Sequence, residues 1–174
     1  MDEYTIYWDS ICEIYFLTKH YLLIGEELSE DFDTIIQPVK EHRDAFDHIT
    51  RVYGLKFSQD SIPDEEAYCI SNMKKAVGHA YRAFFDTADF LTYVCRKKIR
   101  ELLNGRDYDE IVKRYPDYPN VKQMLIDVPF KIAEIRKNKD VSVDDRALID
   151  EVEEDRKILD ELLDAYKAVY SIFG

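Results

Sequence analysis

The sequence predicts an all-α fold: an up-and-down bundle of five or six helices with one long central helix of about 40 residues. Glycine and proline are scarce, at five residues each, which disfavours a loop-rich or many-stranded fold. Apolar residues recur at helical spacing, and strand-like alternation bounded by turn residues is not found. The length of 174 residues and the apolar content of 46% predict one domain, residues 1–174, with a sizeable core.

The first predicted helix covers residues 2–27. Apolar side chains occupy most of its circumference, which is typical of a helix that is central in its bundle or shared with a partner. An N-terminal helix is rarely the buried centre of a small protein, so this pattern favours a homodimer contact. Asp9, Glu13, Lys19 and His20 interrupt the apolar run, whereas a membrane-spanning helix needs about 20 nearly uncharged residues. We therefore expect no membrane contact and a cytoplasmic location.

The second helix is predicted over residues 33–53, with Pro38 tolerated near its start and Gly54 as its C-terminal stop. Its large apolar residues recur at helical spacing and are expected to face the core. They are Ile35, Val39, Phe46, Ile49 and Tyr53.

The third helix is predicted to begin at Pro63 and to reach Asn104–Gly105, since no helix-breaking residue lies between them. Its expected core face consists of residues spaced by three, four and seven: Ile70, Met73, Val77, Ala80, Phe84, Leu91, Cys95 and Leu102. In the C-terminal third, residues 106–120 are predicted to form a short helix and a turn. Residues 121–137 are predicted to form another helix, with a kink at Pro129. A polar connection and an acidic-faced last helix, residues 144–173, follow.

The charge is unevenly distributed. The net charge is −12, which argues against nonspecific binding of the whole molecule to nucleic acid. Residues 96–139, however, contain twelve Lys/Arg and seven Asp/Glu, a local balance of +5. Solvated helix surfaces explain such a segment most simply, and the alternatives are an internal docking contact or a small anionic-ligand or RNA face.

Cofactor and metal motifs are missing from the sequence. The three cysteines, Cys12, Cys69 and Cys95, are far apart in apolar context and resemble reduced core residues. There is no Glu-x-x-His repeat of the kind used by di-metal bundles, and no phosphate-binding glycine loop. We expect no cofactor and no metal.

One polar pattern occurs twice. AFDHITRVY (45–53) and AVGHAYRAF (76–84) both read Ala-x-x-His-x-x-Arg. Helical projection places two sets of polar residues in parallel stripes, one on each helix: Glu41, Asp44, His48 and Arg51, and His79, Arg82, Asp86 and Asp89. The first stripe projects almost opposite Phe46. This favours solvated helix faces, with a structural polar seam and a functional site as the alternatives.

The segment Arg43-Asp44-Ala45-Phe46-Asp47-His48 resembles the Arg-polar-x-x-x-His signature of the HEPN family of small all-helical prokaryotic domains. Many members are metal-independent ribonucleases of toxin or defence systems. The resemblance implies that Arg43 binds the scissile phosphate, that Asp44 orients the pair and that His48 acts as acid/base. Arg43 and His48 lie about 140° apart on one helix, so a composite site needs a second protomer or a helix end.

Two functions are therefore predicted from the sequence. The favoured one is a non-enzymatic helical bundle that acts through protein association, as a homo-oligomer or with a protein partner. The alternative is a HEPN-like ribonuclease or RNA-binding domain centred on Arg43, Asp44 and His48.

Overall fold

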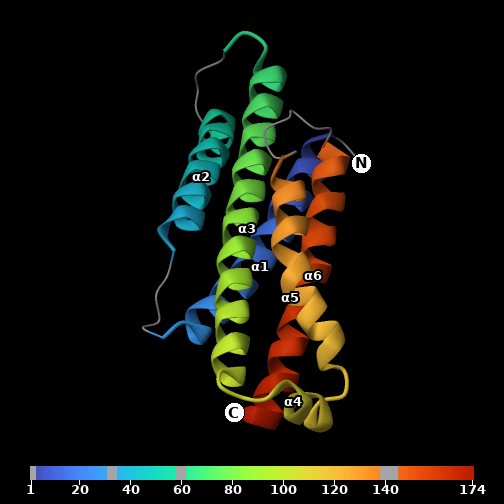
Figure 1. Cartoon of the computed structure of the whole chain (residues 1–174). Helices are drawn as coiled ribbons and strands as arrows, with labels where there is room; N and C mark the ends of the chain where they lie inside the picture. The colour runs from blue at the N-terminus through green and yellow to red at the C-terminus, as the bar shows by residue number, and fades with distance from the viewer. Residues whose placement is uncertain (1–2, 31–34, 58–61, 138–144) are drawn as a thin grey trace.

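The structure, a computed structural model, describes residues 3–30, 35–57, 62–137 and 145–174 (Figure 1). Within these ranges the chain forms six helices and no strands, which confirms the predicted all-α bundle. The helices are α1 (Glu3–Leu28), α2 (Ile36–Phe57), α3 (Glu65–Leu103), α4 (Tyr108–Arg114), α5 (Tyr118–Lys137) and α6 (Asp145–Phe173). The predicted long helix is α3, with 39 residues.

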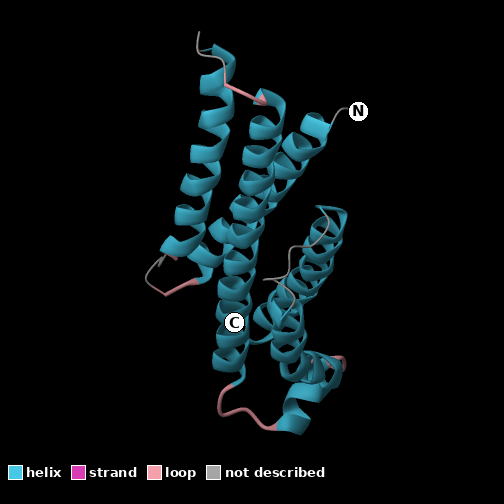
Figure 2. Ribbon diagram, turned by 90° about the horizontal axis from the view of Figure 1, so that it is seen from above, coloured by secondary structure: helices cyan, strands magenta, loops and turns pink. Residues whose placement is uncertain are grey.

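Helix α3 is the spine against which α1, α2 and α6 pack. Figure 1 shows α2 alongside the N-terminal part of α3, while the C-terminal part of α3 extends past it. Helix α5 lies beside α6, and α4 lies at the end of the bundle where α3 finishes. Figure 2 shows the same helices from above; among the described connections, residues 104–107 join α3 to α4 and residues 115–117 join α4 to α5. Each long helix therefore has one face on α3 or on a neighbour of α3, and one face toward solvent.

The main core joins α1, α3 and α6. Phe84, Leu91 and Ile99 of α3 are fully buried, and they belong to one cluster with Tyr21 of α1 and Leu162 of α6. The predicted core face of α3 is largely confirmed: six of its eight residues are buried, while Ile70 and Leu102 are partly buried and pack against the core clusters. Each large apolar side chain that is removed from water stabilises the fold by about 1.5–3 kcal/mol.

Two tyrosine hydroxyls tie this core to α6. Tyr21 of α1 donates a hydrogen bond to Asp160 Oδ1 at 2.7 Å, and Tyr81 of α3 donates to Glu151 Oε2. Burial, and the acceptor carboxylate in each pair, raise the pKa of both phenols. Both tyrosines therefore stay protonated. Each hydroxyl can then donate its hydrogen bond to the carboxylate that accepts it.

The predicted helix boundaries were close for the first, third and last helices. Helix α5 begins at Tyr118, three residues earlier than predicted, and it runs through Pro129. Proline at position 119 is compatible with this start, because the first turn of a helix has no intrahelical partner for its N–H groups. The predicted polar connection between α5 and α6 lies almost entirely outside the described residues.

The predicted inward face of α2 was wrong for three of its five residues. Val39 is 51% exposed, Phe46 65% and Tyr53 40%, whereas Ala45 and Val52 are buried, as is Pro38. The buried residues are small and recur every seven positions, so α2 approaches α3 closely along that row. Ala45 and Val52 share a cluster with Met73, Ala76 and Val77 of α3. Val39, Phe46 and Tyr53 are consequently turned away from α3, whereas Ile49 is partly buried and packs against this cluster.

Gly54 does not end α2, since the helix continues through it to Phe57. A Cβ atom at Gly54 would meet no atom within 4 Å. Gly54→Ala is therefore expected to stabilise the protein by about 0.5–1 kcal/mol, because alanine loses less backbone entropy in a helix than glycine. The melting temperature should rise by about 1–4 °C, as measured by circular dichroism. An unchanged or lower melting temperature would contradict the placement of Gly54 inside a helix.

Candidate functional site

A carboxylate on α2 joins the two helices that carry the repeated polar pattern. Glu41 Oε2 lies 2.9 Å from Arg82 Nε and 2.8 Å from His79 Nδ1, both on α3. The side chains of Glu41 and His79 are only 13% and 20% exposed. Burial acts to raise the pKa of Glu41, but the hydrogen bonds from His79 and Arg82 outweigh it and lower the pKa overall. Glu41 is thus a charged, nearly enclosed acceptor.

The same histidine nitrogen has a second neighbour. Arg82 Nη2 lies 2.6 Å from His79 Nδ1. A ring nitrogen that donates a proton to Glu41 has no lone pair left to accept one from Arg82. The protonation of His79 Nδ1 therefore selects between a Glu41-bonded and an Arg82-bonded arrangement.

His48 extends this polar contact toward the start of α3. Its Nδ1 lies 2.9 Å from Asn72 Oδ1, and Asn72 donates its own amide to the backbone carbonyl of Tyr68 at 2.9 Å. Since Asn72 thereby uses its nitrogen, its oxygen is the acceptor and His48 is the donor. The rings of His48 and His79 stack with centroids 5.4 Å apart. We refer to Glu41, His48, Asn72, His79 and Arg82 as the seam.

The remaining residues of the two predicted stripes lie outside the seam. Arg51 pairs with Asp47 on the surface of α2 at 2.6 Å. Asp86 and Asp89 are partly exposed further along α3. The structure therefore brings together Glu41, His48, His79 and Arg82 of the predicted residues. Asn72 was not predicted, although it lies seven residues before His79, two helical turns away on the same face.

The three HEPN-like positions do not converge in one chain. The Arg43 side chain is 72% exposed, and its Nε and Nη2 atoms donate to Asp44 Oδ1 at 2.9 and 2.7 Å. The hydrogen bond from Arg43 is the main reason that the pKa of Asp44 is lowered. His48 bonds to Asn72 instead. The resemblance to HEPN domains stays a prediction.

The opposite side of α2 carries a continuous apolar surface. Val39, Phe46, Tyr53 and Phe57 project from one side of the helix and are 40–83% exposed; we call them the outer stripe. Tyr53 stacks on Phe57 at 6.5 Å and meets Trp8 of α1 edge-on at 6.2 Å. The outer stripe is thus continuous with the exposed aromatic residues of α1.

A cavity of about 300 Å³ opens between α1 and α2 beside the outer stripe. Its walls are aromatic and aliphatic, apart from one histidine and one cysteine. They are Trp8, Ile11, Cys12, Tyr15, Phe16, His42, Ala45, Phe46, Ile49 and Ala80.

His42 is the polar group of this cavity. Its Nε2 atom is buried and has no hydrogen-bond partner among the described residues, and its ring lies 5.0 Å from that of Tyr15. Burial lowers the pKa of His42 and thus favours the neutral form of its ring. A neutral imidazole is compatible with an apolar contact surface and retains one unused hydrogen-bonding atom.

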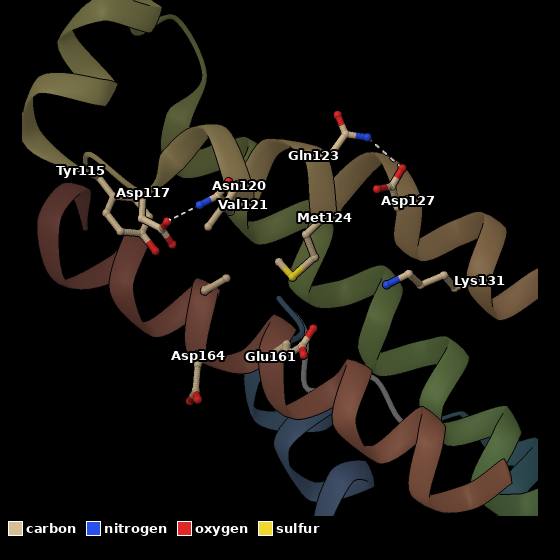
Figure 3. A pocket seen from close by; sticks show the side chains of 11 residues that line it. Tyr115, Asp117, Asn120, Val121, Gln123, Met124, Asp127, Lys131, Glu161 and Asp164 are labelled. Atoms are coloured by element: carbon tan, nitrogen blue, oxygen red, sulfur yellow. Dashed lines mark hydrogen bonds between the residues drawn. The ribbon is translucent and has the colours of Figure 1, made fainter.

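A larger cavity of about 580 Å³ lies between α5 and α6. Figure 3 shows that two of its acidic groups already have partners: Asn120 donates to Asp117 at 2.6 Å and Gln123 to Asp127 at 2.9 Å. Glu161 and Asp164 line it from α6. In the part of the chain that the structure describes, no set of three His, Cys, Asp or Glu residues is arranged to hold a metal ion. The same part contains no helix long and apolar enough to cross a bilayer.

Comparison with known proteins gives no relative. No family model, curated protein or solved structure matches the chain.

Proposed function

We propose that the protein acts by association and that its partner is a second copy of the same chain, bound through the outer stripe of α2 and the adjoining aromatic residues of α1. The observation that carries this proposal is the outward orientation of α2. A row of large apolar residues at heptad spacing is the pattern that helices use to pack on one another. In this chain such a row, Val39, Phe46 and Tyr53, is exposed to solvent.

The size of the surface supports a stable contact. Six connected aromatic residues keep 36–83% of their surface exposed: Trp8, Tyr15, Phe16, Phe46, Tyr53 and Phe57. At about 200 Å² for each aromatic residue, they expose roughly 650 Å². This exceeds the largest apolar patch of an ordinary monomer, about 300–600 Å², and approaches the ~800 Å² that each partner buries in a standard interface.

Charge favours a second copy at this surface. The protein has a net charge of −12, but α2 contains four Lys/Arg and three Asp/Glu. The α2 part of the contact therefore brings together nearly neutral surfaces, although the adjoining α1 contains one Lys and five Asp/Glu. Contact through α6, with four Lys/Arg and nine Asp/Glu, would oppose like charges along the whole helix. A twofold contact between identical surfaces also closes after two copies, as most homo-oligomers do.

The proposal predicts a dimer that one substitution dissociates. Light scattering coupled to gel filtration should give twice the 20.6 kDa mass of one chain. Phe46→Asp should give the mass of a single chain at the same concentration, because the carboxylate would have to be desolvated at the centre of the contact. Its circular dichroism spectrum should be unchanged, since Phe46 is 65% exposed in one chain.

The matched control is Phe130→Asp on α5, where the side chain is 73% exposed and lies outside the proposed contact. This variant should remain a dimer. A wild-type protein that is monomeric throughout the micromolar range, or a dimer that Phe130→Asp breaks and Phe46→Asp does not, would overturn the proposal. A complex formed only with a different protein would likewise replace the second copy as the partner.

A further inference from the structure

The C-terminal part of α3 carries two arginines that have no acidic partner among the described residues. Lys97 and Lys98 both pair with Glu30 and Glu101 at 3.4–3.8 Å. Those pairs occupy the nearby carboxylates, and neither Arg96 nor Arg100 forms an ion pair with a described residue. Two guanidinium groups one helical turn apart therefore remain uncompensated in a protein whose net charge is −12.

Arg96 is also partly enclosed. Its Nε atom is buried, and no hydrogen-bond acceptor among the described residues reaches it. Burial, followed by the positive charge of Arg100, lowers the pKa of Arg96. A buried donor on a charged group costs free energy until an acceptor reaches it, and an oxyanion supplies that acceptor with the required charge.

An exposed aromatic ring completes this surface. Tyr93 is 63% exposed, and it lines a hollow of about 350 Å³ together with Arg96, Lys97, Arg100 and Glu101. Figure 1 shows that this part of α3 extends past α2. A free aromatic face beside two guanidinium groups is the combination that binds a base by stacking and a phosphate by paired hydrogen bonds.

We infer that Tyr93, Arg96 and Arg100 form a nucleotide-binding site, in which the two arginines hold phosphate and the tyrosine stacks on the base. The shared ligand chemistry is a base with its phosphate, supplied either by a free nucleotide or by single-stranded RNA. The site lies apart from the outer stripe, so it does not depend on dimer formation. It also contains none of the HEPN-like residues Arg43, Asp44 and His48.

Fluorescence anisotropy with a labelled single-stranded oligoadenylate tests this inference, with adenosine monophosphate, inorganic phosphate and polyglutamate as competitors. The strand is expected to bind, and Arg96→Gln/Arg100→Gln should weaken binding at least tenfold. Tyr93→Ala should weaken it by about tenfold, the effect of losing one stacked base. Two neutralised phosphates predict a slope of about −1.4 for log affinity against log salt.

The control removes the same charge elsewhere. Lys113→Gln/Lys137→Gln lowers the net charge equally at exposed residues of α4 and α5, and it should leave the affinity within about twofold. Competition by adenosine monophosphate would identify the free nucleotide as sufficient, whereas binding of the strand alone would identify RNA; both support the site. Absence of binding, equal loss in the control, or competition by polyglutamate as strong as by RNA would overturn it.

Discussion

Phe84→Ala is expected to lower the free energy of unfolding by about 3–5 kcal/mol, the largest effect of any single substitution considered for this chain. Phe84 is fully buried and lies where the three long helices of the core meet. Its ring is 6.4 Å from Tyr21 of α1 and 5.4 Å from Phe85, both edge-on. Alanine removes the transfer free energy of the ring and leaves a cavity that rigid helices fill poorly.

Urea unfolding followed by circular dichroism measures this loss. A domain of this kind is stable by about 5–15 kcal/mol, so the variant should fold at low temperature and unfold near physiological temperature. Phe130→Ala is the matched control because its ring is 73% exposed; it should change stability by less than about 0.5 kcal/mol. Equal effects of the two substitutions would contradict the position of α3 at the centre of the bundle.

Glu41→Gln is expected to lower stability by about 1–2 kcal/mol at pH 7. The substitution keeps the shape of the side chain but removes the charge that accepts from Arg82 and His79, and charge-assisted hydrogen bonds contribute about 1.5–3 kcal/mol. The expected loss is smaller than this general range because solvent screens the interaction: the Arg82 side chain is 42% exposed.

The free energy of unfolding that Glu41→Gln removes should become smaller as the pH falls. The pKa of Glu41 is lowered from its ordinary value of 4.5 in the folded protein. Its stabilising effect is therefore complete above that ordinary value and disappears as the pH falls through the lower, folded-state pKa. Urea unfolding of wild type and Glu41→Gln should thus differ at pH 7 and converge as the pH falls below 4.5 and through the lowered folded-state pKa of Glu41.

Asp47→Asn provides the comparison for Glu41→Gln. Asp47 and Arg51 form a surface pair in which both side chains are about half exposed. Its loss should cost only a few tenths of a kcal/mol. If the two substitutions had the same effect at pH 7, the seam would be no more than another solvated surface pair.

The sequence was sufficient to predict most of the fold because the long helices have strong apolar periods and few breakers. The face of α3 was predictable from Met73, Val77, Phe84, Leu91 and Cys95, which are all large or apolar and all buried. Helix boundaries were predictable where proline, glycine or acidic residues marked them. Gly54 misled the prediction, since glycine inside a helix and glycine after its end look alike without the surrounding contacts.

The orientation of α2 was not predictable from residue size. Its large apolar residues and its small ones form two separate rows, and a helix can pack through either. The heptad spacing of Pro38, Ala45 and Val52 was the signal in favour of the observed face, because small residues allow helices to approach closely. Ala76 of α3, which is buried in the same cluster as Ala45 and Val52, is a matching small residue on the facing helix. The observed face of α2 can be told from the predicted one only when the small residues of α2 are paired with those of α3.

The sequence favoured solvated helix faces for the two polar stripes and offered a polar seam only as an alternative. Equal spacing of His and Arg on two successive helices indicated that the stripes could meet, and Glu41, His79 and Arg82 do meet. The roles of Asn72 and of the unpaired Arg96 depend on which neighbours reach them in space, and sequence spacing contains no such information.

Under the proposed function, the two sides of α2 have separate tasks, and this separation bears on how the protein can change over evolutionary time. The small row and Glu41 attach the helix to α3, while Val39, Phe46 and Tyr53 contribute little to the stability of the single chain. Substitutions in the outer stripe are therefore nearly free of folding constraints. Related chains can diverge there to pair only with their own copies, or to acquire different partners, while the same bundle is retained.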